Sequence, residues 1–217
     1  IFSCPALVPT IGQAPRPSSA GETIACTITT RGDLISFLAT YFIGDVHGCF
    51  DAFMRLLNVI DYEPTKDHLA FCGDLIGRGP NSLEVLRFIT AQPKANSVLG
   101  NHDLYAIGQL NGHLPKDPRA NLDALAAAND KADLLAWLIQ QPLVRVAPKQ
   151  QWLLVHAGIP PQWSLNDALN ASQRVTRALK GPKQADFFQQ LLGNTPKIDT
   201  EANNEADTLR YSVNCLT

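Results

Sequence analysis

The chain has 217 residues, of which 45% are hydrophobic and 18% charged, a composition that excludes an intrinsically disordered protein. Its formal net charge of −2 gives no general attraction to DNA or to an anionic membrane surface. The sequence contains neither an apolar run of the ~20 residues that span a bilayer nor a signal-peptide pattern. Together with five cysteines that lack CxxC spacing, these features predict a cytoplasmic protein without membrane contact, structural zinc or a disulfide framework.

Residues 1–38 are rich in proline, serine, threonine and glycine, and their prolines interrupt any periodicity. This composition predicts a flexible or atypical N-terminal extension. The alternative is an extra edge strand, because residues 23–30 have some β character. The chain also lacks an initiator methionine, since its one methionine is Met54, and this indicates a fragment or a processed piece.

Strand and helix patterns alternate from residue 40 onward. Short apolar runs predict strands at residues 39–43, 68–72 and 97–99. The helical spacing of apolar side chains predicts helices over residues 50–60 and 82–90. Strand, loop and helix in repetition imply an α/β domain over residues 39–217, with a mostly parallel sheet covered by helices.

Residues 112–141 have a different pattern. Pro115 and Pro118 indicate a loop, and two short helices are predicted over residues 122–128 and 131–140. We interpret this segment as a small helical cap inserted between core units.

The last third of the chain predicts a hairpin followed by helices. The hairpin joins strands at residues 143–147 and 151–155 through residues 148–150. Residues 164–192 are predicted to be helical with a break at Gly181-Pro182, and residues 209–216 to be a strand cut off at its end.

Four motifs follow the apolar runs that we expect to be strands: Gly44-Asp45-Val46-His47-Gly48, Gly73-Asp74-Leu75-Ile76-Gly77-Arg78-Gly79-Pro80, Gly100-Asn101-His102-Asp103 and His156-Ala157-Gly158. Ligands bind at the carboxyl ends of parallel strands, so these loops are expected to converge. Asp45 and His47 lie two residues apart in an extended loop and project to the same side, where they can bind one cation. Asp74 adds a second carboxylate, and a bridged metal pair would offset its repulsion with Asp45.

The remaining motif residues indicate further ligands and proton-transfer groups. Asn101 offers a neutral oxygen to a second metal, and His156 offers an imidazole. We interpret His102 and Asp103 as a pair in which the carboxylate orients an imidazole that protonates a leaving oxygen. Arg78 is a fork donor suited to phosphate oxygens.

Taken singly, these residues also have structural explanations. Arg78 would equally form a surface salt bridge, His156 a satisfied core position, and Asp45 or the Asn101–Asp103 segment a helix cap. Taken together, two aspartates, two histidines and one asparagine without a thiolate suit manganese, cobalt, iron or zinc and disfavour copper. Two such ions about 3.5–4 Å apart lower the pKa of a bridging water, so the motifs predict hydrolysis of a phosphoester or phosphoanhydride.

Three stretches, residues 73–87, 98–104 and 155–163, resemble the bacterial symmetrical bis(5′-nucleosyl)-tetraphosphatases of the phosphoprotein phosphatase superfamily. The similarity runs from about residue 39 to the end of the chain. It implies a calcineurin-like metallophosphoesterase fold and the hydrolysis of diadenosine tetraphosphate (Ap4A) to two ADP by a metal-bridged hydroxide. Two divalent ions are implied, Mn²⁺ or Co²⁺ first and Fe or Zn next. The implied partner is a small dinucleoside polyphosphate, with capped RNA 5′ ends as an open addition.

The resemblance also implies a role for each motif residue. Asp45, His47 and Asp74 would hold the first metal, and Asp74, Asn101 and His156 the second. His102, steered by Asp103, would act as general acid. Arg78 and Asn101 would contact the phosphoryl group of the substrate.

One departure from the family pattern lies in the C-terminal part. The family has a further metal-binding histidine in a Gly-His-Trp-like segment, whereas no histidine follows His156 in this sequence. We therefore expect weak binding of the second metal and impaired activity in the chain as given. Two alternatives stay open, a serine/threonine protein phosphatase of the same superfamily and a non-catalytic metal-binding fragment. The segment at residues 112–141 and the stretch at 160–163 favour the nucleotide enzyme.

Overall fold

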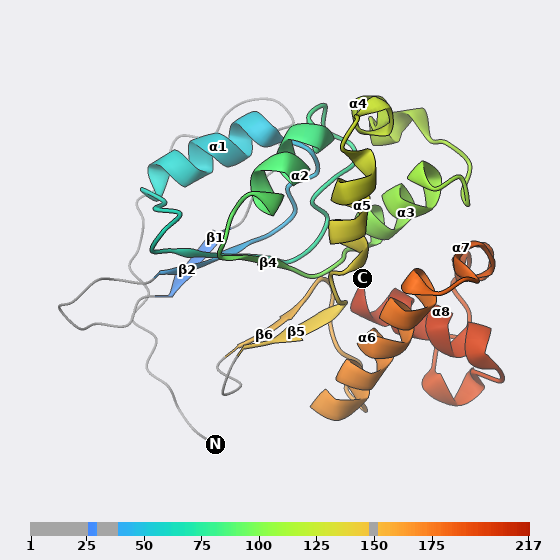
Figure 1. Cartoon of the computed structure of the whole chain (residues 1–217). Coiled ribbons are helices and arrows are strands. Elements are labelled where there is room, and N and C mark those ends of the chain that lie inside the picture. The colour runs from blue at the N-terminus through green and yellow to red at the C-terminus, as the bar shows by residue number, and fades with distance from the viewer. Residues whose placement is uncertain (1–25, 30–38, 148–151) are drawn as a thin grey trace, which may run out of the picture.

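The computed structural model describes residues 26–29, 39–147 and 152–217 (Figure 1). Its main sheet has the strand order β1-β2-β3-β4, with bounds Cys26–Thr29, Thr40–Ile43, His68–Phe71 and Ala95–Ser97. Strands β2, β3 and β4 are parallel, which confirms the α/β prediction, and β1 pairs antiparallel with β2. The edge-strand alternative is thus confirmed for residues 26–29, while the flexible extension predicted for the rest of residues 1–38 lies outside the described residues.

Strand β4 begins and ends two residues before its predicted position at 97–99. The amide of Val98 still donates to Phe71 O at 3.1 Å, but the amide of Leu99 donates to Pro142 O at 2.9 Å. The chain therefore leaves the sheet where its hydrogen bonds pass to the segment before the hairpin.

Helices α1 (Phe50–Val59) and α2 (Ser82–Thr90) cover one face of this sheet (Figure 1). Alternation along the strands turns Phe71 toward them, and its ring lies 5.6 Å from that of Phe53. The opposite face carries the antiparallel hairpin of β5 (Val144–Val146) and β6 (Leu153–Val155). There Phe42 packs on Trp152, with ring centroids 5.5 Å apart. The hairpin is confirmed, and its turn lies outside the described residues.

The insert, residues 112–141, follows helix α3 (Asn101–Leu110) and contains α4 (Asp123–Ala127) and α5 (Lys131–Ile139). Both predicted short helices are confirmed. Leu125, Leu134 and Leu138 are buried in the same hydrophobic cluster as the sheet. The insert is therefore packed into the main core.

The C-terminal helices are α6 (Leu165–Lys180), α7 (Gln184–Leu191) and α8 (Glu205–Leu216). The break after residue 180 matches the prediction from Gly181-Pro182. The strand predicted at residues 209–216 is wrong, because this segment is helical. Leu209, Val213 and Leu216 have helical spacing and are buried, and Asn204 caps the helix by accepting from the amide of Asp207 at 2.9 Å.

Among the helices that the structure describes, none is long and apolar enough to cross a membrane.

Candidate metal centre

Three of the four motif loops meet at the carboxyl ends of the parallel strands, as expected, whereas the fourth, at His156, follows β6 of the antiparallel hairpin. Asp45 and His47 follow β2, Asp74 follows β3, and His102 lies at the start of α3 after β4. Backbone hydrogen bonds tie the first two loops together, since the amides of Val46 and His47 donate to Asp74 O at 3.0 and 2.9 Å. These bonds fix the loop positions independently of the side chains.

Left-handed backbone conformations cluster in these loops. The φ angles of His47, Asp74 and Arg78 are 48°, 51° and 61°. Each costs a non-glycine residue roughly 1–2 kcal/mol, and such strain collects at functional sites when the surroundings hold it in place. Gly100 allows α3 to approach, because a Cβ atom there would collide with the carboxylate of Asp74.

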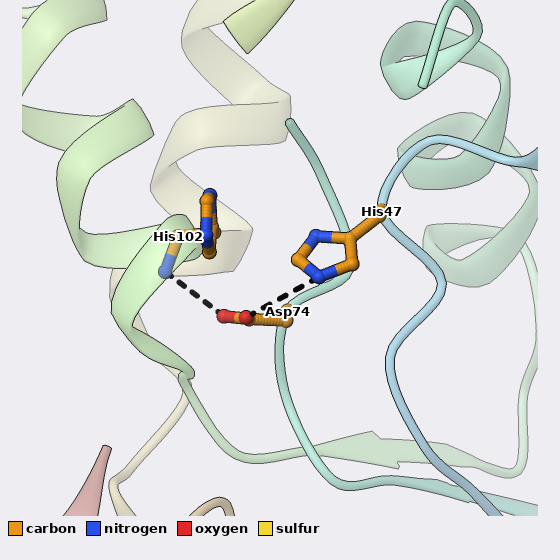
Figure 2. Close-up of side chains that lie close together, drawn as sticks. All are labelled: His47, Asp74 and His102. Carbon is orange, nitrogen blue, oxygen red and sulfur yellow. Dashed lines mark hydrogen bonds and ion pairs between the residues drawn. The ribbon is translucent and has the colours of Figure 1, made fainter. Parts of the chain in front are cut away.

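The buried carboxylate of Asp74 lies between two imidazoles. Its Oδ1 accepts from the backbone amide of His102 at 2.9 Å, as Figure 2 shows. Its Oδ2 lies 3.7 Å from Nε2 of His47 and 3.7 Å from Nε2 of His156. One oxygen is thus held by the backbone while the other faces both imidazoles, which is the position that a bridging ligand requires.

The tautomer of His156 supports a cation at this position. Its Nδ1 lies 2.9 Å from the carbonyl oxygen of Cys72, and a carbonyl can only accept, so Nδ1 carries the proton. In the neutral imidazole, Nε2 then presents a lone pair toward the carboxylate of Asp74. Two electron-pair donors that face the same space fit a metal ion and suit each other poorly without one.

Two groups of side chains have the spacing of metal ligands. Asp45, Asp74 and His156 offer one atom each within 4.8 Å of one another, and so do His47, Asp74 and His102. Nε2 of His47 also lies 3.4 Å from Oδ2 of Asp45, and its buried Nδ1 has no hydrogen-bond partner among the described residues. The donors present therefore fit a pair of divalent cations.

His102 lies against Arg78 at the rim of this centre. The guanidinium NH2 of Arg78 is 3.0 Å from Nε2 of His102, and because a guanidinium only donates, Nε2 is the acceptor in this arrangement. Burial lowers the pKa of His102, and the charges of His47 and Arg78 lower it further, whereas Asp74 raises it. The two observed groups differ from the predicted ligand sets, because His102 joins His47 and Asp74 while Asp45 groups with Asp74 and His156.

Asp103 does not pair with His102 as expected. Its fully buried carboxylate accepts from the amides of Leu75, Ile76 and Gly100 at 2.9, 3.3 and 3.1 Å. Burial and then the charge of Asp74 raise the pKa of Asp103 to about 8. The hydrogen bonds from the three amides lower this pKa, but their effect is smaller. The helix-cap alternative is correct for this residue, because Asp103 is the third residue of α3 and bonds back to the amide before the helix.

Two further residues border Arg78. Asn101 opens α3 and lines the cavity beside Arg78 and His102. Asn121, from the insert, donates its side-chain amide to the carbonyl oxygen of Arg78 and was missed by the sequence reasoning. An asparagine in a proline-containing loop is ordinarily only a turn residue, so no local signal marks this contact.

Comparisons with known proteins agree with this geometry. The calcineurin-like phosphoesterase family model matches residues 38–212. A symmetrical bis(5′-nucleosyl)-tetraphosphatase of Coxiella burnetii is 44% identical over 179 residues, covering 82% of this chain and 62% of the relative. One of Glaesserella parasuis is 40% identical over 181 residues, covering 83% and 66%. The chain thus spans somewhat less than two thirds of the length of these relatives.

A solved structure has a similar fold. The crystal structure of a candidate diadenosine tetraphosphatase superposes with a TM-score of 0.50 at 30% identity, covering 58% of this chain and 53% of the other. Since the family model matches well over half of the chain, and the fold and the ligand groups agree with it, the chain belongs to the calcineurin-like phosphoesterase family.

Proposed function

We propose that the complete protein hydrolyses dinucleoside tetraphosphates symmetrically, converting Ap4A to two ADP. The observation that carries this proposal is Asp74 Oδ2, which lies 3.7 Å from an imidazole nitrogen on each side, with Arg78 and His102 in contact at the rim. This arrangement combines a double cation site with a phosphate-binding group. The names of the relatives, symmetrical bis(5′-nucleosyl)-tetraphosphatases, support the nucleotide substrate over a phosphoprotein.

We infer that two divalent ions are held by Asp45, His47, Asp74, Asn101 and His156. Oxygen and imidazole donors without a thiolate favour Mn²⁺ or Co²⁺, with Fe and Zn as further candidates. When bound, such ions supply Lewis acidity, which lowers the pKa of water and offsets the charge of the phosphates.

Arg78 and His102 carry the remaining roles in this proposal. The guanidinium of Arg78 binds phosphoryl oxygens through its parallel N–H groups, and its exchange from His102 to phosphate leaves Nε2 of His102 available. Once Arg78 has released it, Nε2 would take up a proton from solvent and pass that proton to the leaving oxygen. Asp103 acts through the backbone. Its carboxylate accepts from the amides of Leu75 and Gly100, which belong to the second and third motifs, and so fixes the position of these two loops relative to each other.

The test uses the full-length protein with Mn²⁺ or Co²⁺ and Ap4A. ADP as the sole nucleotide product, separated by ion-exchange chromatography, is the expected result. ATP plus AMP would refute symmetrical cleavage. Rapid hydrolysis of a phosphopeptide without turnover of Ap4A would favour the protein phosphatase alternative. A capped RNA 5′ end, assayed in parallel, tests the wider substrate range.

A further inference from the structure

A cavity of about 670 Å³ opens directly beside Arg78 and His102. It lies between helix α3, which contributes Tyr105 and Gln109, and the insert, which contributes Leu114 and further residues to the opposite wall. Its volume is in the range of cavities that bind small organic ligands. The cavity therefore extends the candidate metal centre toward the insert.

One face of α3 forms the first wall. His102, Tyr105 and Gln109 are spaced i, i+3 and i+7, so they share this face. A rise of 1.5 Å per residue puts Gln109 about 10 Å along the helix from His102. Tyr105 is 42% exposed, although its neighbours Leu104 and Ala106 are buried. An accessible aromatic face thus stands one helical turn from the proposed proton donor.

The insert is held tightly against this face. The amides of His113 and Leu114 donate to Gly108 O at 2.8 and 3.0 Å, and a Cβ atom at Gly108 would lie 2.7 Å from Leu114 Cδ1. The backbone amide of Asp117 donates to Oε1 of Gln109 at 2.9 Å. This bond fixes the Gln109 amide, and within the described part of the chain no group accepts from its nitrogen. A double N–H donor is therefore available to a ligand.

We propose that this cavity binds one nucleoside of the dinucleoside polyphosphate, with the base stacked on Tyr105 and a ring nitrogen accepting from Gln109. The inference rests on the proposed function and deepens it, because it assigns the nucleoside end of the substrate. The phosphate chain then runs from the nucleoside toward Arg78 and the metal centre. Since every base has a π face, stacking on Tyr105 tolerates different bases, whereas the donor at Gln109 favours those with an unprotonated ring nitrogen.

The experiment compares two substrates on the full-length protein, Ap4A and the nucleoside-free p-nitrophenyl phosphate. In Tyr105→Ala, the ratio of kcat/KM for Ap4A to that for p-nitrophenyl phosphate falls roughly 5- to 100-fold, mainly through a higher KM for Ap4A. Tyr105→Phe retains the aromatic face and the parent's ratio. Ala120→Phe narrows the cavity from the insert side and lowers the ratio independently of Tyr105. Leu153→Ala, on β6 and 41% exposed, is the surface control and leaves both rates unchanged.

The outcomes distinguish a failure of the nucleoside-binding proposal from a failure of the proposed hydrolytic function. Equal loss for both substrates in Tyr105→Ala, or an unchanged ratio in both Tyr105→Ala and Ala120→Phe, overturns the subsite while ADP production by the parent upholds the function. A parent protein that hydrolyses p-nitrophenyl phosphate but makes no ADP from Ap4A overturns the proposed function, and with it the nucleoside assigned to this cavity.

Discussion

The loops of the first three motifs, at Asp45, Asp74 and Asn101, and the insert at residues 112–141 are attached to the rest of the molecule in different ways. The loops are joined by backbone bonds, such as Gly79 N to His47 O at 2.7 Å, and by the buried carboxylate of Asp103. The insert packs into the core and is hydrogen-bonded to α3, but its contacts to Arg78 and to α2 are made by side chains at the surface. Asn121 donates to the carbonyl of Arg78, and Asp130 pairs with Arg87.

From this difference we expect the loops to serve metal binding and the insert to serve substrate binding. Backbone hydrogen bonds surround His47 and Asp74, two proposed cation ligands whose backbone is left-handed. Exposed side-chain contacts are weaker and more easily exchanged, so we expect the part of the insert around Asn121 to be where the shape of the cavity can vary. We therefore expect changes in the loops to abolish the reaction, and changes in the insert to alter substrate binding.

Asp74→Asn is expected to have the largest effect. Loss of the bridging charge should lower kcat of the full-length protein by at least on the order of 10²–10³-fold, as for other groups that stabilise transition-state charge. A metal at 100 times its Kd stabilises a folded protein by about 2.7 kcal/mol, so Mn²⁺ should raise the Tm of the parent and barely change that of the variant. Asp133→Asn, an exposed carboxylate on α5, is the control. An undiminished Mn²⁺-dependent rise in Tm would contradict the role of Asp74.

Asp103→Asn should destabilise the fold by roughly 2–3 kcal/mol, measured by urea unfolding. The new NH2 group faces at least one of three backbone donors and leaves it buried without an acceptor. The same change moves the second and third motifs, so kcat should fall together with stability. Stability equal to that of the parent would show that the carboxylate does not hold these loops together.

Asn121→Ala tests the attachment of the insert to Arg78. The change removes the bond to the Arg78 carbonyl and also places alanine at a φ of 50°, so we expect about 1–2 kcal/mol of destabilisation and a higher KM. Asn121→Gly separates the two causes, because glycine accepts the left-handed backbone but lacks the side chain. If Asn121→Gly behaves as the parent does, the side-chain bond has no positioning role.

Asp130→Asn should have the smallest effect, a slight decrease in Tm. The pair is exposed, and Nε and NH2 of Arg87 each lie 2.8 Å from a carboxylate oxygen of Asp130. Salt at about 1 M should therefore remove the difference in Tm between variant and parent. Hydrogen bonding to Arg87 lowers the pKa of Asp130. The stabilisation is therefore present at neutral pH and is lost as the pH falls through that lowered pKa. A decrease in kcat as large as that of Asp74→Asn would abolish the distinction between insert and loops.

Much of the fold follows from local patterns in the sequence. The apolar runs before Asp45 and Asp74 become parallel strands, and helix α2 matches its predicted bounds at residues 82–90. The C-terminal helix was missed because Leu209, Tyr211 and Val213 alternate as in a strand. The same segment also has Leu209, Val213 and Leu216 at helical spacing, and the structure buries all three.

The sequence alone predicted that Asp45, His47, Asp74 and His102 would meet, because parallel strands bring their carboxyl ends to one edge. His156 reaches the same place from β6 of the antiparallel hairpin, for which this rule gives no reason. Only the tertiary structure decided how these groups are held. Asp103 bonds to Leu75 and Ile76, which are 28 and 27 residues away, and Asn121 reaches Arg78 across 43 residues. Such partners depend on how the helices pack on the sheet, and a local pattern of residue types contains no record of that packing.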